Sequence, residues 1–155
     1  MLASRGGGLS VGMIERFNEY TKALEQAYHD DDWSRLAPYF APKATYRSYY
    51  GGDIEVTGRD GVLKQLRVDA ESFDRKFDSR RVEYFDGPRE ERGGVFTMWK
   101  VTYSKAGVPD LVLVGKEIAT YIGDEITLLE GHYLPEIFEE FGVWLSKHGS
   151  FMQAT

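Results

Sequence analysis

Apolar side chains recur every three to four residues from Met13 onward, with charged residues between them. This spacing is typical of a helix with one buried face. The apolar positions of this first helix are Ile14, Phe17, Tyr20, Leu24 and Ala27. The pattern stops in the acidic run from His29 to Asp32. The apolar residues that follow predict a second, short helix that Asp31 or Asp32 caps and that Pro42 ends.

A third apolar series at helical spacing lies further along the chain. Its members are Val62, Leu66, Ala70, Phe73 and Phe77. Thr57 stands three residues before Asp60, which is the spacing of a capping box. Pro135, at a first helical position, introduces a closing helix that we expect to end near Gly149. The pattern therefore predicts three helices in the N-terminal half and one near the C-terminus.

The remaining segments have the composition of β-strands and are bounded by turn residues. The expected strands are 44–50, 54–57, 81–85, 95–104, 111–122 and 125–133. Turns are expected at Gly51-Gly52, Asp86-Gly87-Pro88, Ala106-Gly107 and Gly123-Asp124. Connections of this length join antiparallel strands. The chain is therefore expected to form an α+β fold in which an antiparallel sheet packs on helices.

The expected strand 111–122 is apolar on both of its alternating faces. One face carries Val112, Val114, Ile118 and Ile122, and the other carries Leu113, Ala119 and Tyr121. A sheet that is apolar on both sides needs two covers, and the helices of one chain provide one of them. A second copy of the chain, in a two-fold interface between sheets, is expected to provide the other. The sequence therefore predicts a homodimer.

Composition narrows the class of protein further. The chain has 155 residues, of which 42% are hydrophobic and 14% aromatic, which suits one domain with a substantial core. We assign this domain to residues 13–149, with a flexible arm over 1–12 and a flexible tail over 150–155. A net charge of −6 argues against nucleic acid and against anionic membranes as partners. The chain has no cysteine, which is compatible with a cytoplasmic location, and no apolar run long enough to span a membrane.

Several short segments, taken in order, carry a family resemblance. They are Asp32-Trp33-Ser34-Arg35-Leu36-Ala37-Pro38-Tyr39-Phe40, Ala44-Thr45-Tyr46, Gly58-Arg59-Asp60-Gly61-Val62, Gly115-Lys116-Glu117-Ile118, and Gly123-Asp124-Glu125-Ile126 leading into Glu130-Gly131-His132-Tyr133-Leu134-Pro135. Over residues 14–147 the chain resembles the SnoaL-like polyketide cyclase and ketosteroid isomerase group of the nuclear transport factor 2-like superfamily. The resemblance implies a cystatin-like cone, in which a curved sheet wraps against the helices and encloses an apolar pocket for a small organic ligand. It also implies that dimers are common.

Glu117 is the first candidate for chemistry. By its place in the strand it resembles the position at which ketosteroid isomerases carry a buried, protonated acid. A carboxyl in an apolar cavity has a raised pKa, so it can remain neutral near pH 7 and donate a hydrogen bond. Two placements stay open from the sequence. Glu117 points into the pocket, or it lies on the dimer side and pairs with Lys116 or with an arginine of a neighbour.

Two further residues are candidates for acid–base work. His132 titrates near neutrality, but its neighbours Gly131 and Tyr133 occupy the strand phase that the resemblance directs inward, which favours an outer position for His132. The resemblance places a general-base aspartate at the position of Ser48, and a serine without an adjacent base cannot take a proton from carbon. Asp53 is the candidate replacement, with a solvated turn residue as the alternative.

Aromatic side chains are the most abundant material for a pocket wall, and tyrosine hydroxyls inside a cavity need hydrogen-bond partners. The expected ligand-binding residues are Tyr20, Tyr46, Ser48, Trp99, Tyr103, Gly115, Tyr121, Leu129 and Tyr133. The small Gly115 and Ala119 are expected to leave a groove above their strand. The sequence contains neither a metal-ligand spacing nor a glycine-rich phosphate loop, so no metal and no cofactor is expected.

Three functions are compatible with these features. The first, which we favour, is the binding of a small, largely apolar organic ligand in the cone cavity. The second is a cofactor-independent isomerase, cyclase or dehydratase that acts on a small carbonyl compound, with Glu117, His132 or Asp53 as acid or base. The third is a protein-interaction domain that uses the sheet face. Fold resemblance alone does not choose among them.

Overall fold

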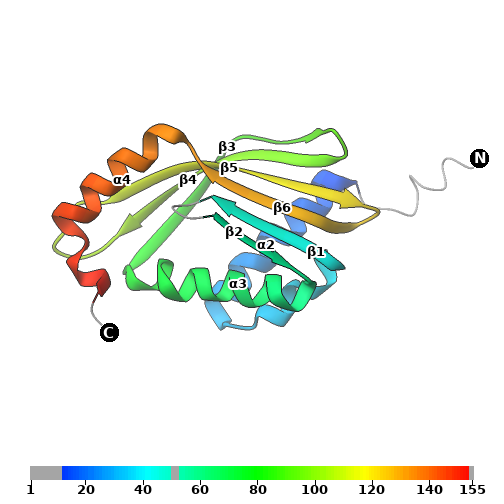
Figure 1. Ribbon diagram of the computed structural model, residues 1–155, viewed down its shortest axis with the longest axis horizontal. Coiled ribbons are helices and arrows are strands. Elements are labelled where there is room, and N and C mark those ends of the chain that lie inside the picture. Colours follow the sequence, from blue (N-terminus) through cyan, green and yellow to red (C-terminus); the bar gives the residue numbers. More distant parts are fainter. Residues whose placement is uncertain (1–11, 50–52, 154–155) are drawn as a thin grey trace, which may run out of the picture.

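A curved sheet is the body of the molecule, and helices lie against its inner face (Figure 1). The computed structural model describes residues 12–49 and 53–153. The expected arm up to residue 11, the expected strand end at Tyr50, the turn Gly51-Gly52 and residues 154–155 of the expected tail lie outside these ranges. The described helical elements are α2 (Met13–Asp30), η1 (Trp33–Tyr39), α3 (Arg59–Ser72), η2 (Asp74–Lys76), α4 (Pro135–His148) and η3 (Gly149–Gln153).

Six strands form one sheet in the described residues, in the order β2-β1-β6-β5-β4-β3. They are β1 (Phe40–Tyr49), β2 (Asp53–Thr57), β3 (Ser79–Glu91), β4 (Gly94–Ser104), β5 (Leu111–Ile122) and β6 (Glu125–Tyr133). This α+β architecture is the predicted fold class. One pairing differs from the predicted antiparallel sheet, because β1 and β6 run parallel. The short turns indicate only how consecutive strands pair, whereas a parallel pair needs a long crossover, and α3 with β3 to β5 provides it.

Two local predictions are corrected in the segment from Thr57 to Gly93. Thr57 does not cap α3; Gly58 is the N-cap residue, and no side chain bonds to the exposed backbone N–H groups there. The segment Asp86-Gly87-Pro88 does not end a strand but lies inside β3, where the register with β4 shifts on both sides of Asp86. The tight turn comes later, at Arg92 and Gly93, which both have positive φ angles. A bulge thus absorbs turn residues without ending the ladder.

The apolar face of α2 packs on the sheet as its spacing predicts, with Phe17, Tyr20, Ala23 and Ala27 buried. Phe17 and Tyr20 belong to a core cluster that includes Phe40, Val62 and Leu129. α2 ends at Asp31, whose φ of 60° is left-handed and whose N–H bonds to the carbonyl of Ala27. The short helix predicted after it is the 3₁₀ helix η1, which follows Asp32 and ends at Tyr39. Pro42 does not end it, because Pro42 already lies inside β1.

A second core cluster lies at the other end of the sheet, where α4 packs (Figure 1). Its buried members are Phe77, Val101, Tyr103, Leu111, Leu113 and Ile137. η3, which occupies most of the expected tail, adds Phe151, whose ring centre lies 5.3 Å from that of Phe77. The two core clusters thus lie at opposite ends of the sheet. No described helix has both the length and the apolar character that a membrane span requires.

Candidate functional site

A cavity of about 510 Å³ lies between the inner face of the sheet and the helices. A volume of this size suits a small organic molecule. Its walls come from α2, η1, β1 to β5, α3, η2 and α4, and β6 contributes Tyr133. The lining residues are Tyr20, Leu24, Glu25, Tyr28, Trp33, Tyr46, Ser48, Ile54, Leu66, Asp69, Ala70, Ser72, Phe73, Asp74, Arg80, Val82, Tyr84, Trp99, Val101, Tyr103, Glu117, Tyr133 and Phe141. Ile54 and Tyr84 are also exposed to solvent, which places them at the rim.

The strand register explains why Glu117 faces this cavity. On β5, Glu117 shares its face with Leu113, four residues before it, and with Ala119, two residues after it. Both of these residues are buried under the helices. Directly opposite Glu117 lie Thr97 of β4 and Gly131 of β6, and Ser48 of β1 lies opposite Gly131. Cross-strand partners share a face of the sheet. Glu117 is therefore the one long side chain in a row of small ones.

The side chain of Glu117 is half-buried, and its carboxyl faces the cavity without a partner in the described chain. Burial raises its pKa from 4.5 to about 7, because the ionised form loses its hydration. No hydrogen bond or ion pair to Glu117 is formed within residues 12–49 and 53–153. The group is thus close to half-protonated at neutral pH. It can either donate a proton to a bound molecule or balance a positive charge on it.

Four tyrosines surround Glu117 closely enough for its negative charge to raise their pKa values. They are Tyr20, Tyr46, Tyr84 and Tyr121, and burial is the largest cause of the raised pKa in each. The hydroxyl of Tyr46 donates to Oδ2 of Asp69 at 3.1 Å. The hydroxyl of Tyr20 is fully buried and has no hydrogen-bond partner in the described chain. A ligand with a polar group can satisfy it.

A second acidic group lies in the cavity near the start of β3. The hydroxyl of Tyr103 donates to Oδ1 of Asp74 at 2.8 Å. Nε of Arg80 lies 4.0 Å from Oδ2 of Asp74, and Nη2 of Arg80 lies 2.8 Å from Oε2 of Glu25. Burial raises the pKa of Asp74 to about 6, although Arg80 and Tyr103 act in the opposite direction. This carboxyl is therefore buried but partnered.

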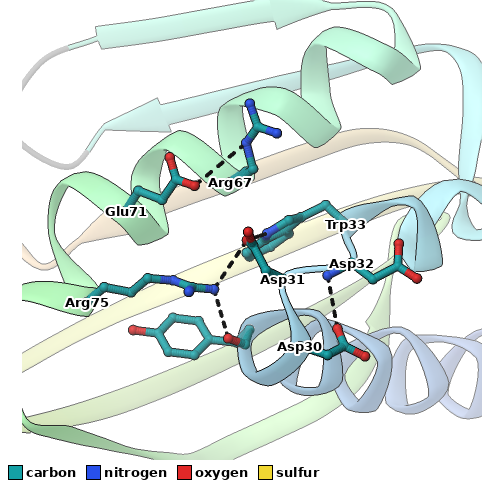
Figure 2. Close-up of polar contacts among 8 residues, drawn as sticks. Asp30, Asp31, Asp32, Trp33, Arg67, Glu71 and Arg75 are labelled. Carbon is teal, nitrogen blue, oxygen red and sulfur yellow. Dashed lines mark hydrogen bonds and ion pairs between the residues drawn. The ribbon is translucent and has the colours of Figure 1, made fainter.

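An acidic run at the end of α2 supports the cavity wall from outside (Figure 2). Oδ1 of Asp31 accepts a hydrogen bond from Nε1 of Trp33 at 2.8 Å and lies 3.5 Å from Nη2 of Arg75. The same Nη2 donates to the carbonyl of Tyr28 at 2.8 Å. Trp33 and Tyr28 both line the cavity. These acids thus position two wall residues, and they form no cluster that could hold a metal ion among the described residues.

The structure places the sequence-predicted residues in two groups. Glu117, Tyr20, Tyr46, Ser48, Trp99, Tyr103 and Tyr133 line the cavity, whereas His132, Asp53, Gly115, Tyr121 and Leu129 do not. His132 lies on the outer face, stacked on Tyr49 with ring centres 4.5 Å apart, and burial and Lys116 lower its pKa. Asp53 is exposed at the start of β2.

The expected groove above Gly115 is filled. A side chain on Gly115 would collide with the ring of Trp99, which lies over it. Ala119 is fully buried in the first core cluster, as is Leu129. The small residue of this row that lines the cavity is Ser48, which is in line with Glu117 through Gly131. Small size at one position therefore indicates a cavity only when the facing side chains are also known.

Five polar lining residues of the cavity were not predicted from the sequence, namely Glu25, Asp69, Ser72, Asp74 and Arg80. Asp69 lies three residues after Leu66 and seven after Val62, so a charge on the apolar face of the predicted helix was an available signal. Asp74 and Arg80 lie at an element end and near the start of a strand. Their approach depends on the three-dimensional fold, so they give no comparable signal.

Comparisons with known proteins identify the fold. No protein-family model and no curated protein matches the chain. A protein with a ketosteroid isomerase-like fold from Catenulispora acidiphila, in complex with trimethylamine, is 17% identical, with a TM-score of 0.58, 88% of this chain covered and 97% of that chain. TerC, co-crystallised with polyporic acid, is 15% identical, with a TM-score of 0.59, 81% of this chain covered and 96% of that chain. A putative polyketide cyclase from Xanthomonas campestris pv. campestris is 18% identical, with a TM-score of 0.52, 86% of this chain covered and 99% of that chain.

These likenesses confirm the predicted fold. The chain has the cone fold of the NTF2-like and ketosteroid isomerase-like proteins. Identities of this size describe the fold alone. The function has to be argued from the cavity of this chain.

Proposed function

We propose that the protein binds a small, largely apolar organic ligand in the cone cavity and that Glu117 is the polar anchor for it. The observation that carries this proposal is a carboxyl that faces a cavity of about 510 Å³ and has no partner in the described chain. A core that served stability alone would pair such a group or replace it. Structural neighbours in complex with trimethylamine and with polyporic acid support the use of this fold for small molecules.

A neutral fluorescent probe tests this proposal directly. N-phenyl-1-naphthylamine is expected to bind one molecule per chain with enhanced fluorescence, because ten of the 23 lining residues of the cavity are aromatic. Ser48→Phe, on the cavity side of β1, should abolish that signal by filling the space. Arg47→Phe, on the opposite side of the same strand, is the matched control and should leave it intact. Circular dichroism checks that both variants fold. Equal probe binding by both variants would place the probe elsewhere and contradict the proposal.

Catalysis in the same cavity is a second candidate function. Its support is that burial brings the pKa of Glu117 to about 7, which suits an acid or base at neutral pH, beside the unpartnered hydroxyl of Tyr20. A cofactor-independent isomerase, cyclase or dehydratase would then use Glu117 to move a proton next to a carbonyl. Exchange of such carbon-bound protons for deuterium, followed by NMR over a panel of small ketones, tests this role. Exchange that survives Glu117→Gln would rule it out.

The outer face of the sheet supports the homodimer that the sequence predicts. Val112 is 43% exposed and Ile122 is 73% exposed on β5, and apolar side chains at such exposure favour an interface. A two-fold dimer through this face would have about twice the chain mass of 17.7 kDa by light scattering. Val112→Lys should lower the measured mass toward that of one chain. A protein-interaction role for this face would instead give a monomer at every concentration.

A further inference from the structure

The cavity is unequally charged. Four of its described lining residues are acidic, namely Glu25, Asp69, Asp74 and Glu117, and Arg80 is the one base among them. In a space with little water, charges of one sign attract ligands of the other far more strongly than on an open surface. The wall therefore disfavours an anion.

Arg80 is already engaged and is not free to balance the other acids. Its guanidinium contacts Glu25 at 2.8 Å and Asp74 at 4.0 Å, and its centre lies 3.9 Å from the ring centre of Tyr28. Asp69 accepts hydrogen bonds from Tyr46 and from Gln65 at 3.1 and 2.8 Å, both neutral groups. Asp69 and Glu117 are thus the two acids of the cavity that have no positively charged partner in the described chain.

These two acids are linked through Tyr46. Its hydroxyl donates to Asp69, and the charge of Glu117 also acts on it. An independent observation points to a ligand at the same place, because the fully buried hydroxyl of Tyr20 has no partner there. A hydroxyl oxygen can accept from an ammonium group. Tyrosine and tryptophan rings also attract cations over their faces, and Trp99 and Tyr84 also line the cavity.

We propose that the ligand is an organic cation, whose amino or quaternary ammonium group lies at the Glu117 and Asp69 end of the cavity while its apolar part packs on the aromatic wall. This inference rests on the proposed function and specifies its ligand class. A neutral ligand of the same shape would remove water from Glu117 without supplying a countercharge. An anion would face Glu117 and Asp69 directly.

Three molecules of nearly the same shape and different charge test the inference. Benzyltrimethylammonium is the cation, neopentylbenzene its neutral counterpart and phenylmethanesulfonate the anion. Each is titrated into the full chain, both by calorimetry and by displacement of N-phenyl-1-naphthylamine. The cation is expected to bind at least about tenfold more tightly than the neutral molecule, which is the size of a desolvated cation–π and ionic contact. The anion is expected not to bind.

Matched variants locate the charge effect. Glu117→Gln, nearly the same in shape, should weaken the cation about tenfold and leave neopentylbenzene unchanged or tighter, which a merely structural role would not do. Glu130→Gln is the control, because Glu130 lies on the outer face beside Arg47. Asp69→Asn is a second variant that should weaken binding of the cation, and its result does not depend on whether the Glu117→Gln variant folds.

The pH dependence provides a further readout, since a quaternary ammonium group carries no proton. The tyrosines that face Glu117 are Tyr20 of α2, Tyr46 of β1, Tyr84 of β3 and Tyr121 of β5, all with raised pKa values and neutral near pH 7. The charged groups of the same cavity are Glu25 of α2, Asp69 of α3, Arg80 of β3 and Asp74 of η2, whose pKa is about 6. The affinity for benzyltrimethylammonium should therefore rise from pH 6 to pH 8 as Glu117 ionises. Glu117→Gln should remove most of the rise between pH 7 and pH 8, where Asp74 is already largely ionised.

The outcomes separate this inference from the proposed function. If neopentylbenzene binds as tightly as the cation, or the anion binds best, the ligand is not a cation, while binding in the cavity stands. If the neutral probe and all three molecules fail to bind, both the proposed function and this inference are overturned. Tighter binding of the cation that Glu117→Gln does not change would place the cation at another site and would also overturn the inference.

Discussion

The two ends of the cavity hold buried carboxyls in opposite circumstances. Asp74 accepts a hydrogen bond from Tyr103 and has Arg80 beside it. Glu117 has neither a hydrogen bond nor an ion pair within the described chain, and its pKa rises to about 7, against about 6 for Asp74. A partnered buried acid ties elements together, whereas an unpartnered one destabilises the fold unless a ligand completes it. The contrast suggests a structural role at one end and a functional role at the other.

Two tyrosines repeat the same contrast. The hydroxyl of Tyr103 has the Asp74 carboxylate as its acceptor at 2.8 Å, whereas the hydroxyl of Tyr20 is buried without a partner. Both side chains line the cavity. Removing groups at the Asp74 end should therefore lower stability, whereas removing the unpartnered carboxyl of Glu117 or the unpartnered hydroxyl of Tyr20 should not.

The largest expected effect is a pH-dependent gain of stability in Glu117→Gln. Because the folded pKa of Glu117 is raised from 4.5 to about 7, the folded state holds the proton more tightly than the unfolded state. The contribution of Glu117 to the free energy of unfolding is therefore fully present below pH 4.5 and is lost as the pH rises to about 7. The loss is about 3 kcal/mol. Urea unfolding should show equal stability of the two proteins near pH 4 and a more stable variant at pH 8.

Glu130→Gln is the control for this effect, because Glu130 is on the outer face and forms only a long ion pair, 3.9 Å from Arg47. Its change should stay within about 0.5 kcal/mol at both pH values. A Glu117→Gln variant whose advantage is no greater at pH 8 than at pH 4 would show that the carboxyl is hydrated or paired in solution.

The second effect is a loss of stability on removing Arg80. Arg80→Met leaves Asp74 buried beside Glu25 without a cation, which is expected to lower the free energy of unfolding by about 2 kcal/mol. The estimate is reduced because Glu25 is 46% exposed and can be hydrated. Arg81→Met is the matched control, since the side chain of Arg81 is 69% exposed. Equal stability of the two variants would show that the Asp74 end does not depend on its ion pairs.

The third effect concerns the hydrogen bond of Tyr103. Tyr103→Phe keeps the ring in the second core cluster and removes only the hydroxyl that donates to Asp74. Unfolding should become easier by about 1 kcal/mol. Tyr84→Phe serves as the comparison, because the Tyr84 side chain lies at the rim, 42% exposed. A Tyr103→Phe variant as stable as the parent would contradict a structural role for this hydrogen bond.

Sequence patterns predicted the fold well where local signals were unambiguous. The limits of β5 and β6 follow from the apolar alternation and from the turn at Gly123-Asp124 between them. The same reasoning failed at Asp86-Gly87-Pro88, because turn residues also fit a bulge, and it gave no information on the parallel pairing of β1 with β6. Local chemistry determines where strands end, but tertiary packing determines which strands meet.

The candidate site was predictable only in part, for a related reason. Glu117 was identified because its place in the strand resembles the position at which ketosteroid isomerases carry a buried acid, and strand alternation predicts which residues share its face. The phase itself followed only from the structure, which also placed His132 on the outer face. Asp74 and Arg80 meet in space from an element end and a strand, so no spacing in the sequence reveals that cluster.

The smallest effect is also the sharpest test of the contrast. Tyr20→Phe removes a buried hydroxyl that has no hydrogen-bond partner in the described chain, so no bond is lost and the desolvation penalty disappears. The free energy of unfolding should rise by about 0.5 kcal/mol. Tyr46→Phe is the control, because it removes a hydroxyl bonded to Asp69 and should lower stability by about 1 kcal/mol. A loss in Tyr20→Phe as large as that control would mean that ordered water already satisfies Tyr20, and the Glu117 end would then need no ligand to complete it.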